Sequence, residues 1–421
     1  MVSEIGTILG KVNDLMSDRE RSEYFLERLV AVPSVSGDEG AVVGVCEKLM
    51  AEVGLSTRRR SCVGVDGAVN VEGVLGSARP KLCIAGHVDT IPFDGMTVNP
   101  LGERRKCRYY GRGTTDMKGG LAAVLAAVDR LVRGGARLHG QLVVVGTASE
   151  ETLKCGGYQL AQDHRDADGV VCAEPSDGRV AVAATGSLAL RLDAYGTGAH
   201  SSVPGGGGNA ILGAHAAAKA VVDALTETVD VRYVGPRRRA VNVGVVRGGI
   251  AQPVVPQRCT VWLDVRYFVG ETAGGLMQRV DAACRQAVAE MPGVRVEASQ
   301  QRLDYEGRPY ERGTWGDFIH VERGMKAFAT DPASSVVRVF REAVKAEGGD
   351  DAIDMMRGWG DVEFVATDHS VPTIYYGPGT VAAAHTADEY IELDRYPHGR
   401  GRLRTRHSRI PRRGPTLIFQ E

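Results

Sequence analysis

The sequence predicts an α/β protein with a mostly parallel sheet flanked by helices, and a smaller α+β domain inserted into it. Short apolar runs at residues 82–85, 142–145 and 170–173 have the length and composition of buried strands. Between the first two, residues 118–133 place their apolar side chains on one helical face. Strands that alternate with helices favour a parallel sheet with helices on both of its faces.

Two further helices are expected before the first strand. Residues 19–32 have apolar positions at helical spacing, and Pro33 ends that segment. Ser36 and Glu39 have the spacing of a capping box, which predicts a second helix that continues to about Met50. The helix–strand alternation of this part of the chain returns after residue 333.

The pattern changes in the middle of the chain. The expected elements there are strand 188–195, helix 209–225, strands 241–246 and 259–265, helix 272–290 and strand 294–298. This β-α-β-β-α-β order suits a ferredoxin-like sandwich of one sheet and two helices. We therefore predict a discontinuous domain formed by residues 1–185 and 302–394, an inserted domain at 186–301, and a separate tail at 395–421.

Composition narrows the class of protein. At 421 residues the chain exceeds the usual size of a single core, and its net charge is −1. The tail holds eight Arg and one Glu, so the rest of the chain is acidic and offers no broad basic face for nucleic acid. The tail itself could be disordered, form an electrostatic contact or reflect an altered reading of the terminus.

The same composition bears on location. No stretch of about 18 apolar residues is present, so we expect no membrane span. The N-terminus lacks a basic segment followed by an apolar run, which argues against a signal peptide. Eight Cys without C-x-x-C spacing favour free thiols in a reducing compartment. Together these features predict a cytoplasmic protein.

Potential metal ligands follow the predicted buried strands, at the sheet edge where α/β proteins bind ligands. The first strand leads into Gly86-His87-Val88-Asp89. On an extended segment the two polar side chains point the same way, so Asp89 could hold the second ring nitrogen of a zinc-binding His87. A purely structural histidine is the alternative.

Carboxylates follow in the same positions. Asp116 precedes the helix at 118–133, as either its N-cap or a bridge between two metals. Glu150 and Glu151 come directly after the second strand, where adjacent carboxylates repel each other unless a cation is present. With a metal bound, one could be a ligand and the other a general base; a solvated acidic loop is the alternative.

Two more candidates complete the set. Glu174 follows the third strand, and His385 follows a glycine-rich turn. The five candidate ligands are His87, Asp116, Glu151, Glu174 and His385. If one carboxylate is shared, each of two zinc ions would have three protein ligands and an open position, as a catalytic site requires.

Six motifs in order, over about residues 20 to 394, resemble those of the di-zinc peptidase and deacylase family. That family includes acetylornithine deacetylase, succinyl-diaminopimelate desuccinylase, aminoacylase and glutamate carboxypeptidase. The motifs are Gly86 to Pro92, Gly111 to Gly120, Glu150-Glu151, Glu174-Pro175, Ala199 to Pro204 and Ala384 to Tyr390. The resemblance implies a phosphorylase/hydrolase-like catalytic domain, with the inserted domain as a lid and dimerisation surface.

The resemblance also implies roles for single residues. His87, Asp116 and Glu174 would hold one zinc, and Asp116, Glu151 and His385 the other. Cobalt could replace zinc.

Outside the ligands, three more residues receive roles from the resemblance. Glu150 would be general base and then general acid, Asp89 would orient His87, and His200 of the lid would polarise the scissile carbonyl. Gly360-Asp361 departs from the Ser-Asp that is more usual in the substrate region of the family.

The implied activity is hydrolysis of the amide bond in a small N-acyl amino acid by a homodimer. A dipeptidase or carboxypeptidase is the alternative within the class. A catalytically inactive binding protein on the same fold is the alternative outside it.

Overall fold

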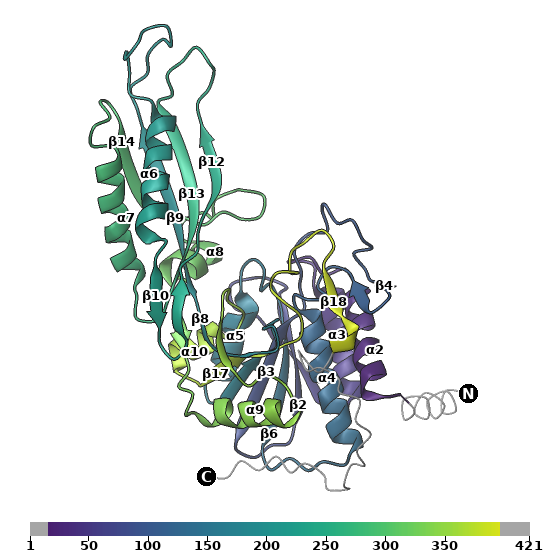
Figure 1. The fold of residues 1–421 in the computed structure, drawn as a ribbon. Coiled ribbons are helices and arrows are strands. Elements are labelled where there is room, and N and C mark those ends of the chain that lie inside the picture. The colour runs from purple at the N-terminus through teal and green to yellow at the C-terminus, as the bar shows by residue number, and fades with distance from the viewer. Residues whose placement is uncertain (1–15, 396–421) are drawn as a thin grey trace. The chain divides into compact units, whose positions relative to one another are not determined.

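The computed structural model describes residues 16–395 (Figure 1). The tail from residue 396 onward and the N-terminal residues considered for a signal peptide lie outside this range. The described chain forms two compact units. The second comprises Ala183–Ala329 with Arg357–Trp359, and the first comprises the remainder. The inserted segment expected at 186–301 lies within the second unit.

A nine-stranded mixed sheet runs through the first unit, in the order β1-β2-β6-β3-β7-β17-β8-β15, with β16 beside β8. Its strands are β1 (Ser56–Ser61), β2 (Val69–Leu75), β3 (Lys81–His87), β6 (Gln141–Thr147), β7 (Gly169–Cys172), β8 (Val180–Ala184), β15 (Phe328–Ala329), β16 (Ile353–Met356) and β17 (Thr373–Tyr375). The last two residues of β8, and β15 with which they pair, belong to the second unit.

The four central strands β6, β3, β7 and β17 are parallel, whereas the flanking pairs are antiparallel. The predicted α/β class is confirmed, and the three predicted buried strands overlap β3, β6 and β7. Most of their side chains are buried because helices cover the strands on both faces.

Helices of the first unit form two groups. They are α2 (Asp18–Val30), α3 (Gly40–Glu52), α4 (Lys118–Arg133), α5 (Cys155–Asp163), α9 (Ser335–Ala346) and α10 (Glu363–His369). The first three share one apolar core with β2 and β6, and Figure 1 shows them together on one side of these strands. The other three pack on β2, β6, β7 and β17.

The capping box predicted at Ser36 and Glu39 is wrong. Helix α3 begins at Gly40 without a side-chain cap, and the Ser36 hydroxyl instead donates a 2.6 Å hydrogen bond to Asp89 Oδ2. A capping box does form one helix earlier, between Ser17 and Glu20 at the start of α2. The same residue types can serve either purpose, and the local sequence does not distinguish them.

The first unit also contains a smaller sheet in the order β18-β5-β4. Its strands are β4 (Glu103–Arg105), β5 (Arg108–Tyr110) and β18 (Tyr390–Glu392). The pairing of β18 with β5 brings the chain that follows His385 back to the segment that precedes Asp116.

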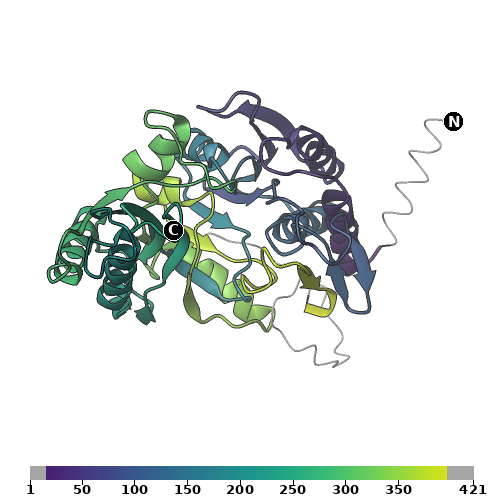
Figure 2. The same cartoon turned by 90° about the horizontal axis from the view of Figure 1, so that it is seen from above.

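The second unit has an antiparallel sheet in the order β12-β13-β9-β14. Its elements are β9 (Gly186–Tyr195), α6 (Ala210–Leu225), β10 (Thr228–Val231), β11 (Gly235–Arg238), β12 (Val241–Gly248), β13 (Arg258–Tyr267), α7 (Ala273–Ala287), β14 (Arg295–Gln300), α8 (Trp315–Asp317) and the π-helix Phe318–Glu322. Helices α6 and α7 lie side by side and share a core with one face of the sheet (Figures 1 and 2). This is the arrangement expected from the β-α-β-β-α-β order.

Within residues 16–395, no helix is both long and apolar enough to cross a lipid bilayer.

Candidate metal centre

His87 is the last residue of β3, and its imidazole is almost completely buried. Its Nδ1 lies 2.9 Å from the carbonyl oxygen of Asp89 and 3.5 Å from the carboxylate Oδ1 of the same residue. Its Nε2 faces the other way, 3.0 Å from Asp116 Oδ1 and 3.6 Å from Glu174 Oε1. One ring nitrogen is thus held by the protein, and the other points into a group of carboxylates.

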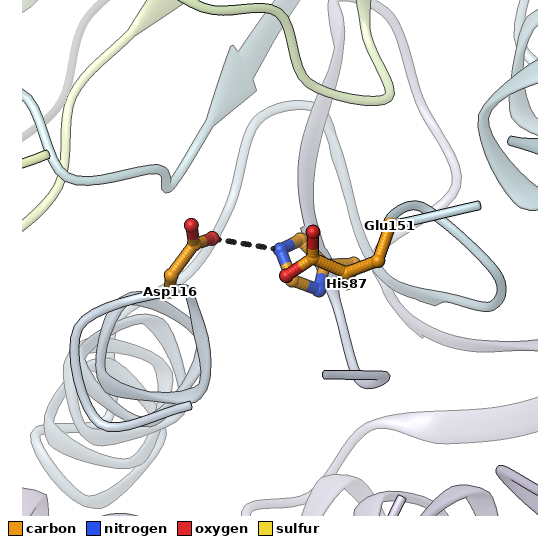
Figure 3. Close-up of side chains that lie close together, drawn as sticks. All are labelled: His87, Asp116 and Glu151. Carbon is orange, nitrogen blue, oxygen red and sulfur yellow. Dashed lines mark hydrogen bonds and ion pairs between the residues drawn. The ribbon is translucent and has the colours of Figure 1, made fainter. Parts of the chain in front are cut away.

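Asp116 lies between the two candidate histidines. Oδ1 of Asp116 faces His87, and Oδ2 lies 3.3 Å from His385 Nε2. The carboxylate therefore lies between two imidazoles and does not cap α4, which begins at Lys118 without a side-chain cap. Figure 3 shows the hydrogen bond between Asp116 and His87, with the carboxylate of Glu151 beside the same imidazole.

The backbone around Asp116 is held by a buried ion pair. Oε1 of Glu389 accepts hydrogen bonds from the N–H groups of Thr115 and Asp116, at 3.0 and 3.2 Å. Its other oxygen accepts from Arg112 at 2.8 Å, and both charged side chains are buried. Since Glu389 follows His385 by four residues, this pair ties together the two segments that supply Asp116 and His385.

Glu151 and Glu174 each lie beside one of the two histidines. His385 Nε2 lies 3.1 Å from Glu151 Oε1, and Glu174 lies on the far side of His87. His385 adopts a left-handed backbone conformation with φ 60°. Glu174 follows β7 beside Gly120 of α4, where an added Cβ would lie 1.9 Å from the carbonyl oxygen of Ala173, so only glycine allows this approach.

Asp89 has a second role besides facing His87. Its Oδ1 accepts the N–H of Glu150 at 3.0 Å and its Oδ2 accepts the N–H of Glu151 at 3.1 Å. With the hydroxyl of Ser36, three donors and one imidazole surround this fully buried carboxylate. Asp89 therefore fixes the loop that carries Glu150 and Glu151 to the strand that carries His87.

Two of the buried carboxyl groups of this cluster have raised pKa values because they are desolvated and close to other carboxyl groups. Burial and the neighbouring Asp116 raise the pKa of Glu151 to about 7 and that of Glu174 well above its usual range. Burial alone would lower the pKa of His87, but hydrogen bonds to Asp116 and Asp89 raise it overall. Without an added positive charge, several carboxyl groups and both histidines must hold protons to coexist here.

The donor set fits zinc. Two imidazole nitrogens and three carboxylates are the ligand types that zinc accepts, and ligand atoms of His87, Asp116 and Glu151 lie within 4.8 Å of one another. The carboxylate of Asp116 faces both histidines, as a shared ligand requires. The structure thus brings together all five residues that the sequence offered as ligands.

His200 belongs to the second unit, on a loop after β9. Its Nδ1 is 2.7 Å from the hydroxyl of Ser202, and its backbone forms an isolated bridge with Val254. The side chain is exposed.

Two buried groups near the site were missed from the sequence. Lys154 donates a hydrogen bond to Glu150 Oε1, and Arg112 pairs with Glu389 as described above. Arg112 and Glu389 both lie within motifs already singled out, which could have signalled their pairing. Asp361, noted above for the substrate region, is instead buried, with Oδ2 bound to the hydroxyl of Thr147.

Comparison with known proteins identifies the family of the chain. Residues 83–404 match the model of the family described as Peptidase family M20/M25/M40. An acetylornithine deacetylase of Edwardsiella ictaluri is 26% identical over 382 residues, which cover 87% of this chain and 91% of the relative. A [LysW]-lysine hydrolase of Deinococcus radiodurans is 26% identical over 385 residues, covering 90% and 94%.

A solved structure shares the fold. A tripeptidase from Staphylococcus aureus superposes with a TM-score of 0.70 at 20% identity, covering 89% of this chain and 94% of its own. Because the family model spans most of the chain, the protein belongs to the Peptidase family M20/M25/M40 and is a hydrolase that acts on amide bonds.

Proposed function

We propose that this protein is a two-zinc hydrolase that cleaves the amide bond of small N-acyl amino acids. The observation that carries the proposal is the position of Asp116, whose two carboxylate oxygens face two different histidines. A further carboxylate lies beside each histidine, Glu174 beside His87 and Glu151 beside His385. This symmetry is what a pair of ions sharing one ligand needs.

His87, Asp116 and Glu174 would hold one ion, and Asp116, Glu151 and His385 the other. When bound, zinc supplies a Lewis acid for the carbonyl and lowers the pKa of water. Asp89 orients His87 through Nδ1. The carboxylate of Asp89 also accepts a hydrogen bond from the N–H of Glu151, which fixes the position of Glu151 relative to His87.

Glu150 would be the general base. It adjoins Glu151 but is not among the residues whose ligand atoms cluster, and its carboxylate is buried. In the proposed reaction Glu150 takes a proton from the attacking water and returns it to the leaving amine. Because the same carboxylate accepts the proton from water and donates it to the amine, its orientation has to allow both proton transfers. His200 is proposed to donate a hydrogen bond to the scissile carbonyl oxygen.

The substrate class follows from the relatives. Acetylornithine deacetylase and [LysW]-lysine hydrolase, by their names, release a group from an amino acid. We therefore place N-acyl amino acids first. The alternative within the class is a dipeptidase or carboxypeptidase that acts on dipeptides or on the C-terminal residue of short peptides. The alternative outside the class is an inactive binding protein, which would bind one of these compounds without hydrolysing it.

A panel of N-acetyl and N-succinyl amino acids and dipeptides, assayed with zinc and with cobalt, tests the proposal. Glu150→Gln should keep the metal content of the wild type and lose nearly all turnover, because only the proton carrier is removed. A general base of this kind contributes about 10²- to 10⁴-fold. Undiminished turnover by Glu150→Gln, or no turnover of any panel member by the zinc-loaded wild type, would refute it.

We also propose a cytoplasmic homodimer that associates through the second unit. Strand β12 is an edge of its sheet, and Val243 and Val246 on it are 43% and 59% exposed. An apolar edge strand of this kind is a pairing surface. All eight Cys are free thiols, which supports a reducing compartment.

A further inference from the structure

Lys154 is a buried lysine in direct contact with the proposed general base. It immediately precedes α5, is 1% exposed, and donates a hydrogen bond from Nζ to Glu150 Oε1. Its backbone is left-handed, with φ 49°, which is uncommon for a residue with a side chain. The N–H of Lys154 donates to the carbonyl oxygen of Ser149, so the loop Ser149–Lys154 is closed on itself.

Two further buried acids lie close to this lysine. Asp361 and Glu363 are each about 1% exposed, and both interact electrostatically with Lys154. Asp361 Oδ2 accepts from the hydroxyl of Thr147, at the end of β6. Among the described residues, the Oδ1 of Asp361 and both oxygens of Glu363 have no hydrogen-bond partner.

Burying an ammonium group costs several kcal/mol, so a buried lysine persists only where nearby anions offset its desolvation. Here the acidic side chains that interact with Lys154 come from three different segments: the loop after β6, the turn before α10 and α10 itself. Asp361 and Glu363 therefore help to offset the cost of burying the lysine, while its hydrogen bond goes to Glu150.

We propose that Lys154 is a positioning residue for Glu150, holding Oε1 so that Oε2 carries the proton between water and leaving amine. This inference rests on the proposed role of Glu150. A carboxylate has two equivalent oxygens and rotates readily when exposed. Fixing one of them selects a single orientation for both proton transfers, and misplacement of a catalytic group by about 1 Å can cost about 10²-fold in rate.

The test compares zinc-loaded wild type with Lys154→Met on the substrate that the panel identifies. We expect kcat to fall about 100-fold, with KM and zinc content unchanged. Lys154→Arg, which keeps a cation and a donor, should recover part of kcat. Arg21→Met is the matched control, because Arg21 is also 1% exposed and pairs with buried Asp129 at 2.9 Å in the same unit. It should lower the thermal midpoint and leave kcat unchanged.

A second variant separates positioning from stability. Lys154→Met leaves Asp361 and Glu363 without their cation, so its thermal midpoint should fall at pH 8.5, which is above the pKa of about 8 of the Glu363 carboxyl. Lys154→Met/Glu363→Gln removes one of these acids and should regain thermal midpoint but not kcat. If kcat returns together with the midpoint, Lys154 is only structural and the proposal fails.

Other outcomes are equally decisive. Wild-type kcat in Lys154→Met overturns the positioning role, and loss of zinc from that variant overturns it in favour of a role in metal binding. Glu150→Gln is run in parallel. If it retains turnover, the proposed function itself is wrong. If it loses turnover while Lys154→Met does not, only the positioning role fails.

Discussion

Asp89 and Asp116 show how one residue type can take opposite roles a few ångströms apart. Asp89 accepts hydrogen bonds from Ser36, Glu150 and Glu151, so donors of the protein itself stabilise its negative charge. Both oxygens of Asp116 instead face histidines that are themselves candidate ligands, so its charge is directed at the site. The groups that face each carboxylate, rather than its sequence neighbours, decide the role.

Glu363 makes stability depend on pH. Burial raises the pKa of its carboxyl to about 8, against about 4.3 in an unfolded chain. Between these values the folded chain holds the proton more strongly than the unfolded chain, so stability falls as pH rises from about 4.3 to 8. Glu363→Gln cannot ionise, and its thermal midpoint should fall less than that of the wild type between pH 5 and pH 8.5.

Asp361, whose pKa is raised to about 7 by burial, also titrates nearby, so the comparison needs a control at the same pH values. Glu342→Gln, on the exposed face of α9, should follow the wild type. If the thermal midpoints of Glu363→Gln and of the wild type fall equally between pH 5 and pH 8.5, the ionisation of Glu363 does not limit stability.

Among the elements, those with an apolar pattern were predictable and those without one were not. Strands β3, β6 and β7 follow from uninterrupted apolar runs, and α4 from its apolar face. Strand β1, with sequence Ser-Thr-Arg-Arg-Arg-Ser, has no such pattern because it lies at the sheet edge with charged side chains exposed. Its pairing with β2 determines its conformation.

The same distinction holds for the site. The five candidate ligands follow strands or turns, so topology alone brings them to one sheet edge. Lys154 was missed because its partners Asp361 and Glu363 lie more than 200 residues away in the sequence. A lysine in a polar loop gives no sign of burial, and only tertiary contacts reveal it.

Strand β12 provides a test of the proposed dimer. Val246→Lys places a charge on the exposed edge and should shift the mass measured by light scattering from dimer toward monomer. Val63→Lys is the matched control, since Val63 is 51% exposed on the first unit. A monomeric wild type, or a Val246→Lys variant that remains dimeric, would contradict association through this strand.

For the whole molecule, the metal centre should contribute to folding stability. Burial and mutual repulsion raise the pKa values of Glu151 and Glu174, so their ionised forms destabilise the folded chain when no cation is bound. Zinc that binds only the folded chain stabilises it by about 2.7 kcal/mol at 100-fold excess over its Kd. Calorimetry should therefore show a lower thermal midpoint after chelation and recovery when zinc is returned.

His385→Ala provides the control, because this variant keeps four of the five ligands and should recover only part of the midpoint. Identical midpoints for chelated and zinc-treated wild type would argue that these residues bind no metal. The measurement needs no substrate, so it is independent of the assignment of the reaction.

The order of the ligands along the chain has a consequence for biosynthesis. His385 and its anchor Glu389 are made more than 200 residues after Glu151, and the whole second unit is made in between. A ribosome-bound chain therefore carries the loop with the proposed general base long before it carries His385. If His385 is a metal ligand as proposed, the chain stays inert toward neighbouring peptides until this residue has been translated and has folded into place.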